Sequence, residues 1–206
     1  MNTTLGRRDF VGFLALAALL PGPATASECR NLGWLLSHRR MVRRFRPDPV
    51  GDDVVRRLID TATRAPSAGH LQPWGFVVVR DPQTRRQLGE AAFGQVWLAE
   101  APVSVVACAD PARARPRYHE RADRYAIVDT AFASMLLLLA VTDMGLGACF
   151  VGAFDDARVR QILKIPSDVQ PLAVVPIGHP AETPEPKRRR ATASTIHHER
   201  WQSDAR

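Results

Sequence analysis

The 206-residue chain has an ordinary globular composition, with 46% hydrophobic and 24% charged residues, and its length fits one domain. These proportions exclude a chain that is disordered throughout. The formal net charge is +7, but the surplus is concentrated in three groups, residues 39–46, 113–124 and 187–190, with no ladder of aromatic residues between them. We therefore expect no nucleic-acid partner, and interpret the charge as a solvated surface that includes a site for one small phosphate.

Residues 1–26 have the pattern of an export signal. Arg7-Arg8 precede an uncharged run over residues 10–20, and Ala24-Thr25-Ala26 has the small-x-small form of a cleavage site. The paired arginines indicate the twin-arginine type, so we expect the twin-arginine translocation machinery as a partner and a periplasmic or otherwise exported protein, cleaved near Ala26. The alternative is a first core helix in a cytoplasmic protein. The apolar run is too short for a permanent membrane span.

The first half of the remaining chain alternates between helical and strand patterns. Apolar spacing predicts helices over residues 31–40 and 52–62, with a brief one over 81–88. Buried strands are expected at residues 76–79 and 103–109. Residues 110–124 are charged and contain proline, which predicts an exposed loop or lid.

The second half contains the longest helical pattern, residues 125–144, with Gly145 placed to cap it. Asp129 and Asp143 bracket its uncharged run, which is too short to span a membrane, so we expect a helix in the core or across a dimer interface. A strand at 147–151, a helix at 155–163 and a strand at 172–177 follow. The pattern predicts an α+β sandwich around one sheet, with one domain over residues 27–190 and a polar tail over 191–206.

The cysteines and histidines give no metal or nucleophile signature. Cys108 and Cys149 lie in apolar strand-like contexts, where they could be free core residues or, in an oxidising compartment, a disulfide. There is no G-x-S-x-G and no H-E-x-x-H, and His197-His198-Glu199 lies in the polar tail. We therefore expect no metal site and assign no catalytic side chain.

Three separated blocks carry the most specific information. They are Arg39-Arg40-Met41-Val42-Arg43, the loop segment Ala65-Pro66-Ser67-Ala68-Gly69-His70-Leu71-Gln72-Pro73-Trp74, and Gly145-Leu146-Gly147-Ala148-Cys149-Phe150-Val151-Gly152-Ala153-Phe154. In residue identity, order and separation they closely resemble the nitroreductase family of flavin mononucleotide (FMN) enzymes. The resemblance implies a nitroreductase-like α/β sandwich, with a mostly antiparallel sheet flanked by helices, in an intertwined homodimer whose C-terminal tails embrace the partner.

The resemblance also assigns the cofactor contacts. The FMN phosphate would be held by Arg39, Arg40, Arg43, Lys187 and Arg189, because guanidinium groups donate paired hydrogen bonds to phosphate. Met41 stands where the family usually has serine, so we expect only its backbone to help. The ring of the opposite protomer's flavin would meet the backbone of Pro66, Ser67, Ala68 and Gly69, with His70 in the place of a frequent asparagine. Gly152 and Ala153 would present a backbone amide toward flavin N5.

By this resemblance the chain is an FMN-dependent oxidoreductase that alternates between a donor, with NAD(P)H as a candidate, and a nitroaromatic or quinone-like acceptor. Reduced nicotinamide is expected to be scarce outside the cytoplasm, which leaves the donor of an exported enzyme open. Dehalogenation, oxidation by oxygen and cleavage of flavin are alternatives within the fold, and the arginine-rich segment 110–124 would suit an anionic substrate. A non-catalytic flavin-binding envelope protein is the alternative from another class.

Overall fold

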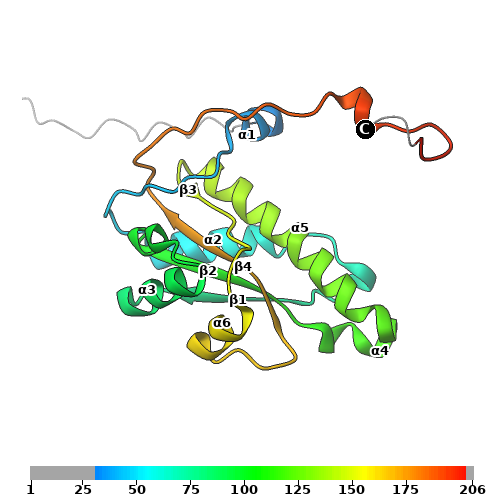
Figure 1. The fold of residues 1–206 in the computed structure, drawn as a ribbon, viewed down its shortest axis with the longest axis horizontal. Helices are drawn as coiled ribbons and strands as arrows, with labels where there is room; N and C mark the ends of the chain where they lie inside the picture. The colour runs from blue at the N-terminus through cyan, green and yellow to red at the C-terminus, as the bar shows by residue number, and fades with distance from the viewer. Residues whose placement is uncertain (1–30, 203–206) are drawn as a thin grey trace, which may run out of the picture.

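The computed structural model describes residues 31–202, so the predicted export signal and Cys29 lie outside the described residues. Its centre is a four-stranded antiparallel sheet with strand order β1-β2-β4-β3 (Figure 1). The strands are β1 (Trp74–Val79), β2 (Val103–Ala109), β3 (Gly147–Ala148) and β4 (Gln170–Gly178). This sheet and the helices around it confirm the predicted α+β class.

Strand β2 forms the middle of the sheet because every one of its residues is buried. Val105 pairs with Val78 of β1 on one side and with Val175 of β4 on the other. Such a strand, buried on both faces, is a continuous apolar run in the sequence and not an alternating one. Both faces of the sheet must therefore be covered.

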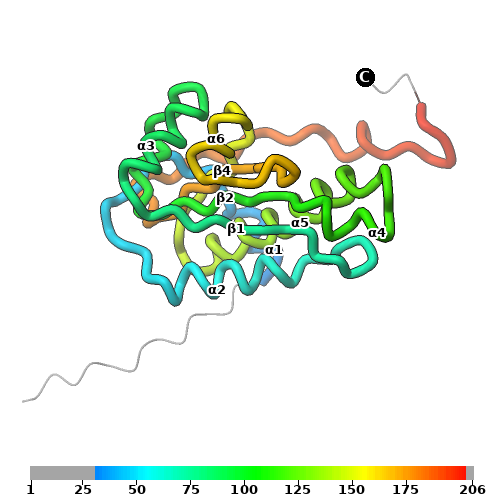
Figure 2. The backbone as a smooth tube through the Cα atoms, turned by 90° about the horizontal axis from the view of Figure 1, so that it is seen from below, coloured from blue at the N-terminus to red at the C-terminus, as the bar shows by residue number. Residues whose placement is uncertain are grey.

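Helices cover the two faces in pairs, as Figure 2 shows, with the strands between them. On one face lie α2 (Asp52–Ala62) and the long α5 (Ala122–Asp143), and on the other lie α3 (Pro82–Ala91) and α6 (Asp156–Leu163). The start of α3 is fixed by Asp81, whose side chain accepts from the Thr84 amide, and by proline at the first helical position. The remaining helices, α1 (Leu32–His38) and α4 (Arg115–Tyr118), lie near opposite ends of α5 (Figure 1).

Two segments differ from their predicted structure. Residues 110–124, expected as a loop, form three short helical turns (Pro111–Arg113, α4 and His119–Arg121) and the start of α5. Charge had indicated exposure, but Ala114 and Ala122 are buried and Asp110 accepts from the Ala112 amide, which winds the chain instead of leaving it extended. The strand predicted at 147–151 is only two residues long, and Val151 makes an isolated bridge to Val174 of β4.

Cys108 and Cys149 are both buried and both free. Of the two options that the sequence left open, the structure therefore has the unpaired one. Burial raises the pKa of Cys108 to about 11, and it also raises the pKa of Cys149. Neither thiol is an activated nucleophile.

One helical stretch in the described region, Arg115–Asp143, is long and apolar enough to cross a membrane by length and composition alone. Its α5 part packs on α2 and on the sheet, and Leu137 and Val141 are almost completely buried there. These contacts are those of a core helix. By contrast, the segment after β4 runs across the top of the molecule and extends away from its body (Figure 1).

Candidate active site

A basic cavity of about 480 Å³ lies where the chain leaves α1. We call it the arginine socket. Its walls come from two segments far apart in the sequence, residues 36–43 and 184–189. They include six of the predicted site residues: Arg39, Arg40, Met41, Arg43, Lys187 and Arg189. The structure thus brings together all the residues predicted to contact a phosphate.

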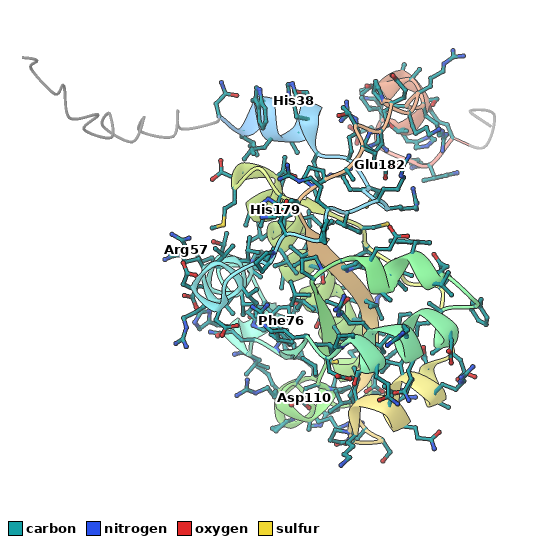
Figure 3. The ribbon with its side chains drawn as sticks, turned by 90° about the vertical axis from the view of Figure 1, so that its left-hand side faces the viewer. His38, Arg57, Phe76, Asp110, His179 and Glu182 are labelled. Carbon is teal, nitrogen blue, oxygen red and sulfur yellow. The ribbon has the colours of Figure 1, made fainter. Side chains whose placement is uncertain are left out.

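Glu182 joins the two walls of the arginine socket. Its carboxylate oxygen Oε1 accepts from the backbone amides of Arg43 (2.6 Å) and Arg44 (3.1 Å). Beside these contacts, the Ala181 amide donates to the Arg44 carbonyl oxygen (2.9 Å). Figure 3 shows Glu182 at this crossing, below His38 on α1. Sequence reasoning missed Glu182, since a single glutamate between proline-rich turns carries no recognisable pattern.

The arginine socket has an excess of positive charge that the protein does not satisfy. Atom Nη1 of Arg39 is buried and has no hydrogen-bond partner. Burial lowers the pKa of Arg39, and the nearby positive charges of Arg189 and Arg40 lower it further. A buried guanidinium without an acceptor is costly, and an oxyanion would supply both the charge and the acceptors. This donor set fits the phosphate of a flavin mononucleotide.

The other two arginines of the first block are partly engaged. The Arg40 guanidinium donates to the backbone oxygens of Ser37 (2.7 Å) and Arg39 (3.0 Å), so it also satisfies carbonyls at the end of α1. The Arg43 guanidinium lies 5.8 Å from the centre of the Trp97 ring. Arg39 is therefore the arginine of this block with a buried, unpaired donor.

The side chain of Met41 packs in the core behind the arginine socket. It forms a bridge with Ala148 beside β3, and its thioether sulfur lies 3.4 Å from the backbone nitrogen of Phe150, which donates to it. The side chain also packs against both main core clusters. A long, polarisable side chain can fill the gap between two packed layers in this way. That only the backbone of Met41 helps to hold the phosphate stays a prediction.

Gly152 and Ala153 follow directly on this bridge and are exposed. A Cβ on Gly152 would meet only atoms at 3.5 Å or more, so the fold itself does not require glycine there. The Gln95 side-chain amide donates to the Ala153 carbonyl oxygen at 3.3 Å. Gln95 and Trp97 belong to one turn, so this turn contacts both the Gly152–Ala153 segment and Arg43.

The loop Pro66–Gly69 lies elsewhere and is held by α5. Its Ala68 amide donates to the buried carboxylate of Asp129 (3.0 Å), and burial raises the pKa of Asp129. The hydroxyl of Ser67 accepts from the Gln72 amide (3.0 Å). Gly69 has φ of 59°, a left-handed conformation that suits glycine. Sequence reasoning treated Asp129 only as one of two charges that bracket an uncharged run, and missed its contact with the loop.

His70 and Gln72 also have positive φ values, 58° and 50°. The Gln72 amide nitrogen donates to Nε2 of His70 at 3.0 Å, and His70 is exposed. Trp74, by contrast, is buried in a small cluster with Ala65 and Ala133, so the end of this loop segment is fixed in the core. Strained backbone held by a buried anchor is typical of loops that contact ligands.

One chain does not bring the two groups of residues together. The loop Pro66–Gly69 is attached to the first half of α5, whereas the arginine socket lies beyond its other end, and α5 has 22 residues, or about 33 Å of helix. Figure 3 shows the same separation, with Glu182 and Asp110 at opposite ends of the molecule. Asp110 is beside the loop, since its amide donates to the Pro73 carbonyl oxygen (2.8 Å).

Comparison with known proteins identifies the family. The model of the nitroreductase family matches residues 36–98 and 94–179, a region that contains the first block, the loop and the Gly152–Ala153 segment. The chain belongs to the nitroreductase family. Lys187, Arg189 and Glu182 lie beyond the matched region.

Named relatives extend the comparison. A Thermus thermophilus protein named NADH dehydrogenase is 40% identical, over 73% of this chain and 87% of its own length. The iodotyrosine deiodinase of Haliscomenobacter hydrossis is 30% identical, over 71% of this chain and 78% of its own. The solved structure of the Vibrio harveyi NADPH:FMN oxidoreductase complexed with NAD+ superposes with a TM-score of 0.75 at 26% identity, over 82% of this chain and 77% of its own.

Proposed function

We propose that this nitroreductase family member is an FMN-dependent oxidoreductase. The observation that carries the proposal is the arginine socket, in which a buried Arg39 nitrogen lacks an acceptor and like charges surround it. One bound phosphate removes both penalties. The relative with NADPH:FMN oxidoreductase in its name supports FMN as the cofactor and NAD(P)H as the electron donor.

In this mechanism the chain's own residues bind the FMN and orient it. Arg39, Arg43, Lys187 and Arg189 hold the phosphate, while Gly152 lets the backbone approach the flavin ring closely, because it has no side chain there. Bound FMN supplies the electron transfer between donor and acceptor. Asp129 fixes the Ala68 amide and so keeps the loop Pro66–Gly69 in one conformation. No side-chain acid or base is assigned.

We further propose a homodimer in which each flavin lies between the arginine socket of one protomer and the loop Pro66–Gly69 of its partner. The separation of the two groups within one chain supports a site that a second copy completes. A surface for that copy is present. Val128, Phe132 and Met135 are partly exposed at helical spacing on α5, and Leu32 and Leu36 are exposed on α1. The extended C-terminal segment carries two more exposed apolar side chains, Ile196 and Trp201, which would pack on the partner.

The acceptor we propose is a nitroaromatic or quinone-like molecule, reduced in a ping-pong cycle. A second candidate activity, reductive dehalogenation, is favoured by the similarity to an iodotyrosine deiodinase. Two further alternatives are an enzyme that uses oxygen and a non-catalytic flavin-binding protein of the envelope. Either protein would bind FMN but would not pass electrons from NAD(P)H to a nitroaromatic or a quinone, so the spectroscopic assay below distinguishes them.

Export through the twin-arginine machinery stays part of the proposal, on the pattern of residues 1–26. The size and location of the protein in wild-type and translocation-deficient cells test it. We expect a shortened periplasmic form only in wild-type cells. An unprocessed cytoplasmic protein in both would overturn it.

The visible absorption spectrum of the purified protein tests the function. We expect flavin bands and one FMN per chain, bleached by NAD(P)H under anaerobic conditions and restored by a nitroaromatic or quinone. A colourless protein that takes up no added FMN would overturn the proposal. A protein that binds FMN but is not reoxidised by these acceptors, and dehalogenates instead, would select the second candidate.

A further inference from the structure

The connection between β2 and α5 packs directly on the loop Pro66–Gly69. A Cβ built on Gly69 would stand 2.9 Å from Nη1 of Arg117 and 2.9 Å from the hydroxyl oxygen of Tyr118. These two side chains of α4 therefore lie against the loop backbone. Glycine at position 69 leaves room for them as well as permitting the positive φ.

Within residues 31–202 Arg117 has neither an ion-pair partner, as Arg115 has, nor a hydrogen-bond acceptor, as Arg113 has. Arg115 is within 3.5 Å of the Asp123 carboxylate, and Arg113 donates to the Gln72 carbonyl oxygen. Among the ion pairs of residues 31–202 none includes Arg117, although its guanidinium carbon is held 5.7 Å from the centre of the Tyr118 ring. The Tyr118 ring is itself fixed by edge-to-face packing on Tyr125, with 4.7 Å between centroids.

Arg117 is thus an exposed guanidinium, positioned by an aromatic ring and unpaired in charge, beside the loop on which the flavin ring is proposed to lie. The FMN phosphate does not account for Arg117, because the arginine socket supplies the ligands of the phosphate. The socket lies at the opposite end of the protomer, where Figure 3 labels Glu182. A planar guanidinium next to a tyrosine ring suits an oxyanion attached to an aromatic or nucleotide framework.

We propose that Arg117 binds an oxyanion, a carboxylate or a phosphate, on the molecule that exchanges electrons with the flavin, and so determines substrate preference. This inference rests on the proposed function, since it places the substrate over the same loop. The oxyanion has two sources: a carboxylate on the acceptor or the extra ribose phosphate of NADPH. The two half-reactions distinguish them.

The test uses the flavin-loaded protein and matched pairs of reactants. The variants are R117Q, which removes the charge, R117K, which keeps it, and R86Q, which removes another exposed arginine, from α3 on the opposite side of the molecule (Figure 1). Reoxidation is measured with para-nitrobenzoate and nitrobenzene, and reduction with NADPH and NADH. Calorimetric binding of benzoate and benzamide gives a readout that does not depend on turnover.

In R117Q we expect the rate preference for para-nitrobenzoate over nitrobenzene, or for NADPH over NADH, to fall about tenfold. This is the size expected for the loss of one hydrogen bond between charged groups. R117K should retain most of the preference, and R86Q all of it. A fall confined to para-nitrobenzoate and benzoate assigns the acceptor, and one confined to NADPH assigns the donor. Equal losses for charged and neutral members, or the same fall in R86Q, would overturn the proposal. A protein that binds no FMN would instead contradict the proposed function.

Discussion

At the scale of single residues, the candidate site depends on groups that the fold does not satisfy or does not need. Arg39 has a buried nitrogen without an acceptor, and Gly152 lacks a side chain where one would fit. The buried carboxylate of Asp129 accepts from one backbone amide of the loop Pro66–Gly69. The unpaired Arg39 nitrogen and the missing side chain at Gly152 lower or fail to raise the stability of the folded chain, which is typical of residues retained for a ligand.

Replacing Gly152 separates the ligand from the fold. In G152A the new methyl group would make ordinary contacts within the protein, so we expect the free energy of unfolding of the flavin-free protein to change by less than about 1 kcal/mol. The methyl group would stand between the backbone and the flavin ring, so FMN affinity should fall about tenfold or more. Thermal unfolding and FMN titration measure the two effects. G75A is the matched control, because a Cβ on Gly75 would meet no atom within 4 Å. Equal FMN affinity in G152A and G75A would contradict the placement of Gly152.

Replacing Asp129 tests the anchor of the loop. D129A leaves the Ala68 amide without its acceptor, which should cost about 1 to 2 kcal/mol of unfolding free energy and weaken FMN binding. D129N keeps an acceptor oxygen and should retain the loop. Urea unfolding with FMN titration would measure both, and identical behaviour of the two variants would argue against the anchor.

The pH dependence of stability follows from the direction of the Asp129 shift. Because burial raises its pKa in the folded state above the usual 3.8, the folded state holds the proton more tightly than the unfolded state does. The stabilisation present at low pH is therefore lost as pH rises from about 3.8 through the folded pKa. We expect D129N to equal the wild type in strongly acidic solution and to become the more stable of the two above this window. Parallel unfolding free-energy curves for the two proteins would contradict the shift.

At the scale of elements, the C-terminal segment completes the arginine socket and Glu182 holds it in place. E182A removes the acceptor for the Arg43 and Arg44 amides, so Lys187 and Arg189 should lose their fixed position. We expect FMN affinity to fall about tenfold, as for loss of a charge-assisted hydrogen bond. D168A removes the same charge from an exposed turn between α6 and β4, outside the arginine socket, and should not weaken binding. A similar fall in both variants would show that charge and not the contact matters.

Most elements could be predicted because their patterns are local. The buried valines of β2 and the amphipathic α2, with Asp52 and Asp53 in its first turn, needed no long-range information. Segment 110–124 could not be predicted, since burial of Ala114 and capping by Asp110 outweigh its charge. The sequence also placed Arg39 and Lys187 in one site only through the family resemblance, because their proximity depends on Glu182, a contact between segments about 140 residues apart.

At the scale of the whole molecule, the proposed site needs two chains for each flavin. The arginine socket and the loop Pro66–Gly69 lie at opposite ends of one protomer, and exposed apolar side chains on α1, α5 and the C-terminal segment offer a surface for a second copy. Burial of a continuous apolar face is the main driving force for such association. A composite site also makes FMN binding depend on dimer formation, and dimer stability on FMN.

The most direct measurement is the FMN content of a dimer built from two defective chains. One chain carries R39A and R43A, which damage the arginine socket, and the other carries G69V, which strains the loop and displaces Arg117. Each variant alone should bind little FMN. Co-expressed with different affinity tags and purified as the mixed dimer, the pair should contain one FMN per dimer, because one of its two sites combines the undamaged halves. A mixed dimer with no FMN, from chains that still fold and associate, would contradict the composite site.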